Sequence, residues 1–260
     1  MEDQSNSQGS SYITSVNTAK KYLYTGDVSI NINTVEEDVI SFDLEHVSKS
    51  DNINYYFQKS IEADQATFLV PYFNVVPKDS FYEEDIELYI KSTFPNYDRE
   101  HFNIRYDFVS TDYLYVIYAI PKSVNIQNTF NHFISKMLAC NRKLIQDNNQ
   151  TFIHVYFQQN EFVLTAYKDG KLIQCNFYKF YDQVDALYFI MLSINQIEFD
   201  QKTDHLHISG RVIEDSSLYR LLSQFINHIH LVNNDLKSYS QLHGTAIDEQ
   251  YIFDVFGLLH

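Results

Sequence analysis

The chain has 260 residues, 45% of them hydrophobic, and this length and composition suit two globular domains with separate cores rather than a disordered protein. Its formal net charge of −15 repels nucleic-acid phosphates and anionic lipid head groups, and no basic cluster offsets it, so we expect no nucleic-acid partner. No apolar run approaches the roughly 20 residues of a membrane span, so membrane insertion is not expected either.

A first domain is predicted over residues 22–147, after a polar segment, 1–21, that is typical of a disordered tail. Alternating or continuous apolar residues predict its strands: 28–32, 40–44, 68–72, 104–108 and 113–120. Helical spacing predicts helices over 53–61, 82–90 and 126–138. Ser80 and Glu83 form a capping box before the second helix, and Pro71 indicates that the third strand is interrupted or lies at an edge.

A second domain is predicted over residues 148–260, after a polar linker at 146–150. Its predicted strands are 152–157, 162–167, 172–177 and 205–209, and Asp169-Gly170 is a type I′ hairpin signal. Two predicted helices have apolar inward faces: Val184, Leu187, Tyr188, Met191 and Leu192 in one, and Leu218, Leu221, Leu222, Phe225, Ile226 and Ile229 in the other. Hairpin, helix, strand and helix thus occur twice, with an extra strand pair and helix in the first copy. This order predicts an α/β protein with mixed sheets.

Three short segments carry a resemblance to a known family: Val70-Pro71 with Val76-Pro77-Lys78, Asn176-Phe177 ahead of Asp185-Ala186-Leu187-Tyr188, and Leu206-His207-Ile208-Ser209-Gly210. From about Tyr22 onward the chain resembles an uncharacterised bacterial family of unknown function that is assigned to the actin-like ATPase fold. It is more distantly similar to the actin-like scaffold proteins of type IV pilus assembly and type II secretion. The resemblance implies two duplicated ribonuclease-H-like units.

The resemblance also implies where nucleotide would bind, because active actin-like ATPases hold phosphates on two hairpin turns that contain aspartate and glycine. Glycine lets backbone N–H groups approach the anion, and aspartate organises Mg²⁺ and water. We predict the first turn at Thr34 to Asp38, with three carboxylates, and the second at Gln158 to Asn160. Neither turn has a glycine, and no nearby glycine is expected to replace it. Ser209-Gly210-Arg211 keeps one glycine of a nucleoside-side motif, which is expected to serve a tight turn.

The histidines of the second half offer a possible metal pair. His205 and His207 lie two residues apart in a predicted strand and so face the same side. The sequence places no cysteine or third ligand to complete a site, which favours a position at a rim or in a loop. His228 and His230 are expected at the end of a helix, where they would point to different faces. No metal site is therefore predicted.

Acidic residues at helix starts resemble catalytic carboxylates, but capping explains them. Asp182 and Asp185 flank a helix start, where exposed N–H groups favour carboxylates. Acidic residues in the first turn of the 82–90 helix predict a solvated face: Glu83, Glu84, Asp85 and Glu87.

The two cysteines, Cys140 and Cys175, are too few for a disulfide framework and predict a reduced, cytoplasmic location with both thiols in the core. Arg142 and Lys143 lie near Cys140 and would lower the pKa of its thiol if their charges dominated, but one such neighbourhood is a weak signal.

These patterns favour a non-enzymatic, actin-like protein that acts as a scaffold or regulator through contacts with an unidentified protein partner. No catalytic, cofactor-binding or metal-binding residue is predicted, and no cofactor is expected. The alternative is a divergent nucleotide-dependent ATPase or sugar-kinase-like phosphotransferase. Its ligand would lie between the two domains, near Asn160, Gly210 and the 34–38 turn. A third possibility, a nucleotide sensor that binds without hydrolysis, is not separated from the first by the sequence.

Overall fold

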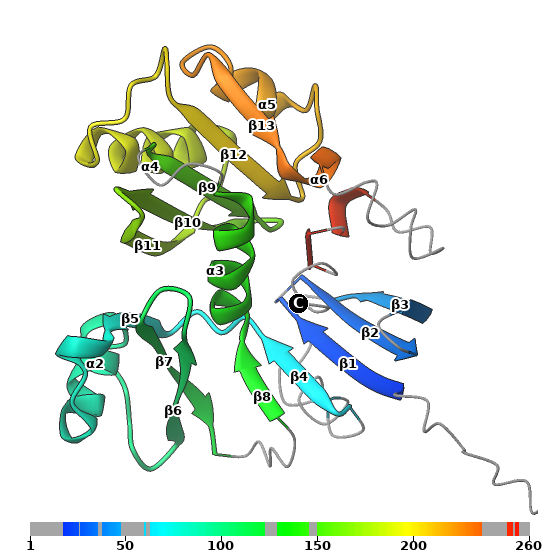
Figure 1. Ribbon diagram of the computed structural model, residues 1–260, viewed down its shortest axis with the longest axis vertical. Helices are drawn as coiled ribbons and strands as arrows, with labels where there is room; N and C mark the ends of the chain where they lie inside the picture. The colour runs from blue at the N-terminus through cyan, green and yellow to red at the C-terminus, as the bar shows by residue number, and fades with distance from the viewer. Residues whose placement is uncertain are drawn as a thin grey trace, which may run out of the picture.

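The computed structural model describes residues 18–25, 27–35, 38–47, 60, 63–122, 129–145, 150–235, 249–251 and 253–254. The described strands form two five-stranded sheets and one three-stranded sheet, which we name the first sheet, the second sheet and the small sheet (Figure 1). Helices pack on these sheets, so the protein is a mixed α/β protein, as predicted. None of the helices in the described ranges combines the length and apolarity needed to cross a membrane.

The first sheet has the strand order β3-β2-β1-β4-β8. Its strands are β1 (Thr18–Tyr24), β2 (Val28–Val35), β3 (Asp38–His46), β4 (Gln65–Phe68) and β8 (Thr129–His132). β1, β2 and β3 are antiparallel neighbours, while β4 runs parallel to β1 and β8 runs parallel to β4. The leading hairpins therefore give a mixed sheet.

The second sheet repeats this plan with the order β11-β10-β9-β12-β13. Its strands are β9 (Phe152–Phe157), β10 (Glu161–Lys168), β11 (Lys171–Lys179), β12 (His205–Gly210) and β13 (His228–Leu231). β9, β10 and β11 are antiparallel, and β12 is parallel to both β9 and β13. Asp169 and Gly170 join β10 to β11 with φ values of 52° and 68°, which confirms the predicted type I′ turn.

The small sheet is inserted between β4 and β8 and has the order β5-β7-β6. It consists of β5 (Phe73–Pro77), β6 (Phe102–Val109) and β7 (Leu114–Pro121). Two 3₁₀ turns, η2 (Lys78–Ser80) and η3 (Glu83–Asp85), lead into α2 (Ile86–Thr93), whose Ile90 packs with Ile117 in a separate core. This insertion accounts for the extra strand pair and helix that the sequence indicates in the first half.

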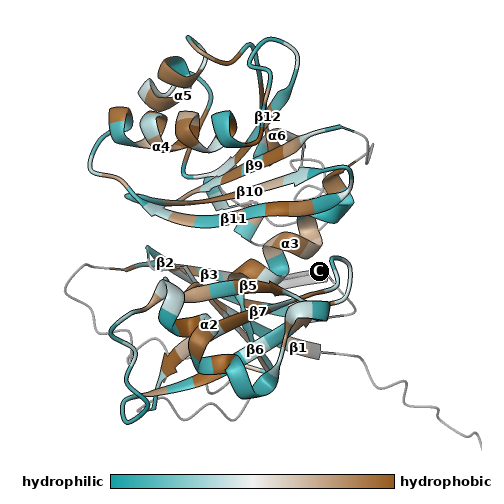
Figure 2. Cartoon of the chain, turned by 90° about the vertical axis from the view of Figure 1, so that its left-hand side faces the viewer, coloured by the Kyte–Doolittle hydropathy of each residue, from teal (hydrophilic) through white to brown (hydrophobic). Residues whose placement is uncertain are grey.

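Helix α3 (Phe133–Leu144) lies between the two halves of the molecule (Figures 1 and 2). Asn141 donates from Nδ2 to Thr165 Oγ1 on β10 at 2.9 Å. Arg142 forms an ion pair from Nε to Asp112 Oδ1, in the β6–β7 turn, at 2.7 Å. α3 therefore ties the second sheet to the small sheet, and its buried side chains share one core with both halves.

The opposite face of the second sheet is covered by α4 (Gln183–Gln196) and α5 (Ser217–Leu222). Ala186, Ile190 and Ile194 of α4 are fully buried. Two short segments follow, α6 (Val232–Asp235) and η4 (Glu249–Tyr251). The sheet therefore has an apolar core on each face.

The start of the first sheet differs most from the sequence predictions. β1 begins at Thr18, inside the segment 1–21 that is predicted to be a tail. Lys20 and Lys21 interrupt the apolar alternation, which hid this strand in the sequence. Consequently the 34–38 hairpin joins β2 to β3 and is the second hairpin of the sheet, not the first. The division into domains at residues 147 and 148 stays a prediction.

Other elements of the first half also lie elsewhere than predicted. The 68–72 strand is divided, because residues 69–72 connect β4 to β5. Phe130 lies in β8, and the helix predicted over 126–138 begins only at Phe133. The Ser80–Glu83 capping box is not formed, since no side chain caps η3 or α2. The predicted helix at 53–61 lies outside the described residues except for Ser60.

Two predictions for the second half are corrected. The inward face of α4 was predicted wrongly: Val184 and Tyr188 are 65% and 62% exposed. The small residues Ala186 and Ser193 face the sheet instead and let the helix approach it closely. α5 ends at Leu222, and 228–231 is a strand rather than the end of a helix.

Candidate functional site

Two hairpin turns occupy equivalent positions in the two five-stranded sheets. In the first sheet, β1 turns into β2 at 25–27, and Thr25 N donates to Val28 O at 3.1 Å. In the second sheet, β9 turns into β10 at 158–160, and Gln158 N donates to Glu161 O at 2.8 Å. The Gln158 side chain also donates from Nε2 to Thr25 O, so the two turns contact each other.

The first of these turns reads Thr25-Gly26-Asp27, with Gly26 itself outside the described residues. The sequence prediction took the 34–38 hairpin as the first turn, where no glycine occurs, whereas the first hairpin of the sheet lies at 25–27 and contains one. Asp27 also supplies the carboxylate of the motif, and Thr25 Oγ1 donates to its Oδ1 at 2.6 Å. The glycine–aspartate pair one residue after the Tyr22-Leu23-Tyr24 run was the sequence signal for this turn.

Gly210 ends β12 beside the second turn and has a φ of +84°, in the left-handed region. A Cβ at this position would lie 2.0 Å from Phe157 O, so the backbone there excludes every side chain. Arg211 N donates to Phe157 O at 2.9 Å, and Asn233 donates from Nδ2 to Gly210 O at 3.1 Å. Gly210 therefore serves the tight turn that the sequence predicts.

This turn directs the side chain of Arg211 toward the first half of the molecule. Its guanidinium forms two bonds with Asp27, from Nε to Oδ2 at 2.9 Å and from Nη2 to Oδ1 at 3.1 Å. Nη1 donates to Asp254 Oδ2 at 2.6 Å and to Gln250 O at 2.9 Å. The guanidinium also lies over the Tyr251 ring, 4.3 Å from its centroid. We name Asp27, Arg211, Tyr251 and Asp254 the arginine cluster.

The arginine cluster is shielded from solvent, with only 9% of the Arg211 side chain exposed and none of the Asp254 side chain. Burial by itself lowers the pKa of Arg211, but the charge of Asp254, with Tyr156 and Asp27, raises it overall, so the guanidinium stays charged. Burial raises the pKa of Asp254 against the opposing charge of Arg211. Both Asp254 oxygens accept hydrogen bonds, from Arg211 and from Tyr156 Oη, which is the pattern of an ionised carboxylate.

The place between the two turns thus holds an internal cation and its carboxylate partners. A phosphate group there would meet Asp27 and Asp254, and would have to compete with them for Arg211. Bidentate arginine–carboxylate pairs of this kind are strong and directional. The arrangement is suited to holding the two halves together. The sequence did not bring these residues together, because Asp254 has no motif of its own and Asp27 lies far from Arg211 in the chain.

The remaining acidic and thiol candidates are structural. Asp182 caps α4, accepting at Oδ1 from Val184 N at 2.8 Å and from Asp185 N at 2.9 Å, as predicted. Burial raises the pKa of the Cys140 thiol to about 12, outweighing the charges of Lys143 and Lys136. A raised pKa of this size opposes activation of the Cys140 thiol.

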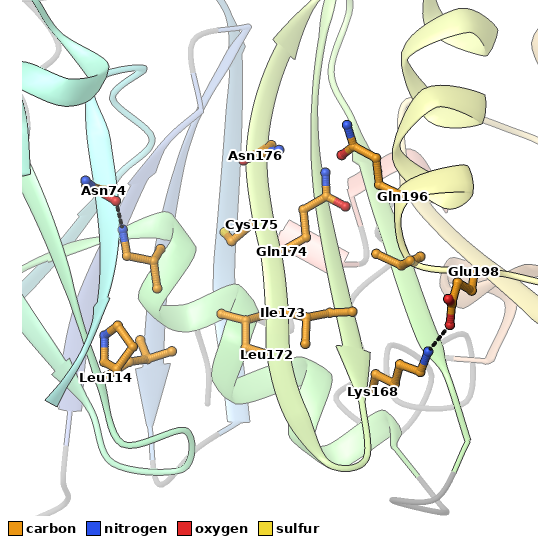
Figure 3. A pocket seen from close by; sticks show the side chains of 13 residues that line it. Asn74, Leu114, Lys168, Leu172, Ile173, Gln174, Cys175, Asn176, Gln196 and Glu198 are labelled. Atoms are coloured by element: carbon orange, nitrogen blue, oxygen red, sulfur yellow. Dashed lines mark hydrogen bonds and ion pairs between the residues drawn. The ribbon is translucent and has the colours of Figure 1, made fainter. Parts of the chain in front are cut away.

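A cavity of about 690 Å³ lies between β11 and β5. Figure 3 shows Cys175 of β11 on the side of Asn74, and Gln174 of the same strand pointing toward Gln196. Lys168 Nζ and Glu198 Oε2, 3.0 Å apart, close one end, and Oε1 of Gln174 is buried there without a hydrogen-bond partner among the described residues. No residue of the two turns lines this cavity, so it is separate from the arginine cluster.

Comparisons with known proteins agree with this architecture. A family model described as a protein of unknown function, DUF3822, matches residues 7–229. A crystal structure from Bacteroides thetaiotaomicron, of a protein with actin-like ATPase fold and unknown function, superposes with a TM-score of 0.74 at 17% identity, covering 91% of this chain and 99% of that chain.

The PilM–PilN type IV pilus biogenesis complex superposes with a TM-score of 0.60 at 8% identity, covering 93% of this chain and 97% of that chain. No curated protein matches the sequence of this chain. The actin-like ATPase fold expected from the sequence is therefore confirmed. Sequence identities of 17% and 8% show a shared fold and not a shared function.

Proposed function

The chain belongs to the DUF3822 family of unknown function, and we propose that it is a non-hydrolysing scaffold or regulatory protein that acts through protein–protein contacts. Its partner is another protein in the cytoplasm rather than a nucleic acid, because the net charge of −15 opposes binding to phosphate backbones.

The observation that carries this proposal is the position of Arg211 between the two hairpin turns. In a working ATPase of this fold, backbone N–H groups and Mg²⁺ must reach the phosphates there. Here the Arg211 guanidinium is held on both sides by Asp27 and Asp254, and the Tyr251 ring covers it. A nucleotide would have to break this buried ion pair and face its carboxylates, which opposes turnover.

Contacts with a protein partner are supported by two surfaces outside the arginine cluster. Val184, Tyr188 and Leu192 lie one helical turn apart on the outer face of α4 and are exposed. β11 is an edge strand of the second sheet, and an extended segment can pair with such an edge. The similar PilM–PilN structure is itself a complex of two proteins, which agrees with this reading of the fold.

The alternative function is a divergent nucleotide-dependent ATPase or phosphotransferase with its site between the two halves. One observation favours it: the first turn does contain the Gly26-Asp27 pair. Asp27 is the residue that would organise Mg²⁺ in that case, and it would have to exchange Arg211 for the metal.

Thermal unfolding of the purified protein with ATP, ADP and GTP, each with and without Mg²⁺, separates the two functions. Ligand at a hundredfold excess over its Kd stabilises the fold by about 2.7 kcal/mol. We expect no nucleotide-dependent shift in melting temperature. A Mg²⁺-dependent rise that disappears in Asp27→Asn and persists in Asp43→Asn, an exposed carboxylate of β3, would establish the alternative instead.

A further inference from the structure

Four histidines gather on one side of the second sheet. β12 and β13 are parallel neighbours, with His205 opposite His228 and His207 opposite His230. Side chains two residues apart in a strand point to the same face, so this register brings all four together, and we name them the histidine cluster. The sequence places His228 and His230 in a helix, and only the strand β13 reveals that they complete the cluster.

The rings of the cluster are in direct contact. The His205 ring stacks on the His228 ring with centroids 4.8 Å apart and on the His230 ring at 4.7 Å, and His207 lies 5.2 Å from His230. Nδ1 of His205 and Nε2 of His230 are 2.5 Å apart. Two imidazole nitrogens that face each other at this distance repel through their lone pairs unless a proton lies between them or the pair opens to admit a metal ion.

Three of the four rings of the histidine cluster are accessible to solvent. His205, His228 and His230 are exposed, while His207 is half-buried and stacks on Phe152 at 4.5 Å. Neutral imidazole is the form that binds metal ions. The cluster begins β12, whereas Gly210 ends it, so it is remote from the arginine cluster.

We propose that the histidine cluster binds one divalent transition metal ion of the zinc, nickel and copper class, with His205 and His230 as its first two ligands. Imidazole nitrogen suits these metals and not Mg²⁺. Bonds of about 2.0–2.1 Å to a tetrahedral ion would set the two nitrogens roughly 3.3 Å apart, so the pair opens slightly on binding. Within the described residues no three His, Cys, Asp or Glu side chains yet converge on one point, so His228 or His207 rotates to supply the third ligand.

Calorimetric titration of the protein, free of any histidine tag, with ZnCl₂ and separately with MgCl₂ tests the site. We expect one Zn²⁺ per chain and no binding of Mg²⁺. His205→Gln with His230→Gln should weaken Zn²⁺ binding roughly tenfold or more. His101→Gln, which removes an exposed histidine of the first half, is the matched control and should leave binding unchanged.

A second measurement uses the wild-type chain alone, in case the double variant does not fold. Co²⁺ added to the protein should give the visible absorption of a site with nitrogen ligands, and Zn²⁺ should displace it. Absence of Zn²⁺ binding, or equal binding by the double variant and His101→Gln, would overturn the proposal and leave a shared proton as the reason for the short contact.

Discussion

The first and second sheets follow the same plan, but different residues occupy the equivalent positions at the ends of β4 and β12. In the first sheet Tyr24 pairs with Phe68, and Leu69 N donates to Tyr24 O at 2.8 Å. In the second sheet Phe157 pairs with Gly210, and the next residue, Arg211, donates from N to Phe157 O at 2.9 Å. Gly210 and Arg211 are thus the counterparts of Phe68 and Leu69.

This comparison shows how two copies of one backbone plan come to be joined by a side chain from only one of them. Leu69 is buried in the apolar core of its own half. Arg211 instead reaches the turn of the other half and pairs with Asp27 there. The backbone hydrogen bond is the same in both copies, so the link depends on the side chain at one position and on the glycine that directs it. The following predictions test these two residues first.

Arg211→Leu, which gives the second half the residue of the first, has the largest expected effect. Removing the guanidinium leaves Asp254 buried without its cation, and loss of one partner of a buried pair costs about 3–5 kcal/mol. Unfolding in urea measures the free energy of unfolding. Asp254→Asn added to Arg211→Leu should recover part of the loss, because it removes the unpaired charge.

The matched control is Arg220→Leu, since Arg220 is exposed and lies 3.9 Å from its partner Asp215. Surface pairs contribute about 0–1 kcal/mol. If Arg211→Leu and Arg220→Leu unfold at the same urea concentration, the arginine cluster does not hold the halves together.

Gly210→Ala should destabilise the fold by about 2–4 kcal/mol, from an unfavourable positive φ and from a Cβ that overlaps Phe157 O. Gly170→Ala is the comparison, because Gly170 also has a positive φ, 68°, in the two-residue β10–β11 turn. Gly170→Ala should lower the free energy of unfolding by only about 1 kcal/mol. Both variants carry the strain of a positive φ, but only Gly210→Ala places a Cβ against Phe157 O. Urea unfolding of both therefore measures the cost of this overlap. Equal losses of unfolding free energy would show that the overlap costs nothing.

Among the described residues each half buries one neutral histidine, His132 before α3 and His154 on β9. His154 has Asn141 Oδ1 at 2.6 Å from Nδ1 and Ser209 Oγ at 2.8 Å from Nε2. Burial lowers the pKa of both histidines to about 3, below the value of about 6.5 in the unfolded chain. The unfolded state therefore binds more protons as pH falls from about 6.5 toward 3, and stability is lost in that window.

Each histidine should reduce the free energy of unfolding by about 2 kcal/mol between pH 7 and pH 5. Urea unfolding at both pH values, compared between wild type and His154→Gln, isolates the contribution of the second half, and His132→Gln that of the first. A variant with the full wild-type pH dependence would show that its histidine is not held neutral.

The second half was more predictable from sequence than the first for physical reasons. The 152–157 strand was predicted with its observed bounds, because it is apolar throughout and the turns around it are polar. β1 was missed because Lys20 and Lys21 interrupt its pattern. The face of α4 was misassigned because apolar residues surround this helix, and only the packing of Ala186 and Ser193 on the sheet selects one face.

The arginine cluster and the histidine cluster were less predictable than the fold, because the residues that meet in them are far apart in the chain. Gly210-Arg211 was identified by motif, but Arg211 lies 184 positions from Asp27 and 43 from Asp254. His205 and His230 are 25 positions apart and meet only through the β12–β13 register. Such pairings follow from sheet order, which local patterns do not specify.

The smallest predicted effect compares the helices that cover the two halves. In the second half Asp182 caps α4 by accepting from two backbone N–H groups, whereas in the first half Asp85 precedes α2 without a side-chain hydrogen bond. Asp182→Ala should therefore cost about 1 kcal/mol of unfolding free energy, and Asp85→Ala close to nothing. Thermal unfolding of the two variants measures the difference. An equal loss in both would mean that nearby negative charge stabilises these helix starts, and that the cap geometry of Asp182 adds nothing to it.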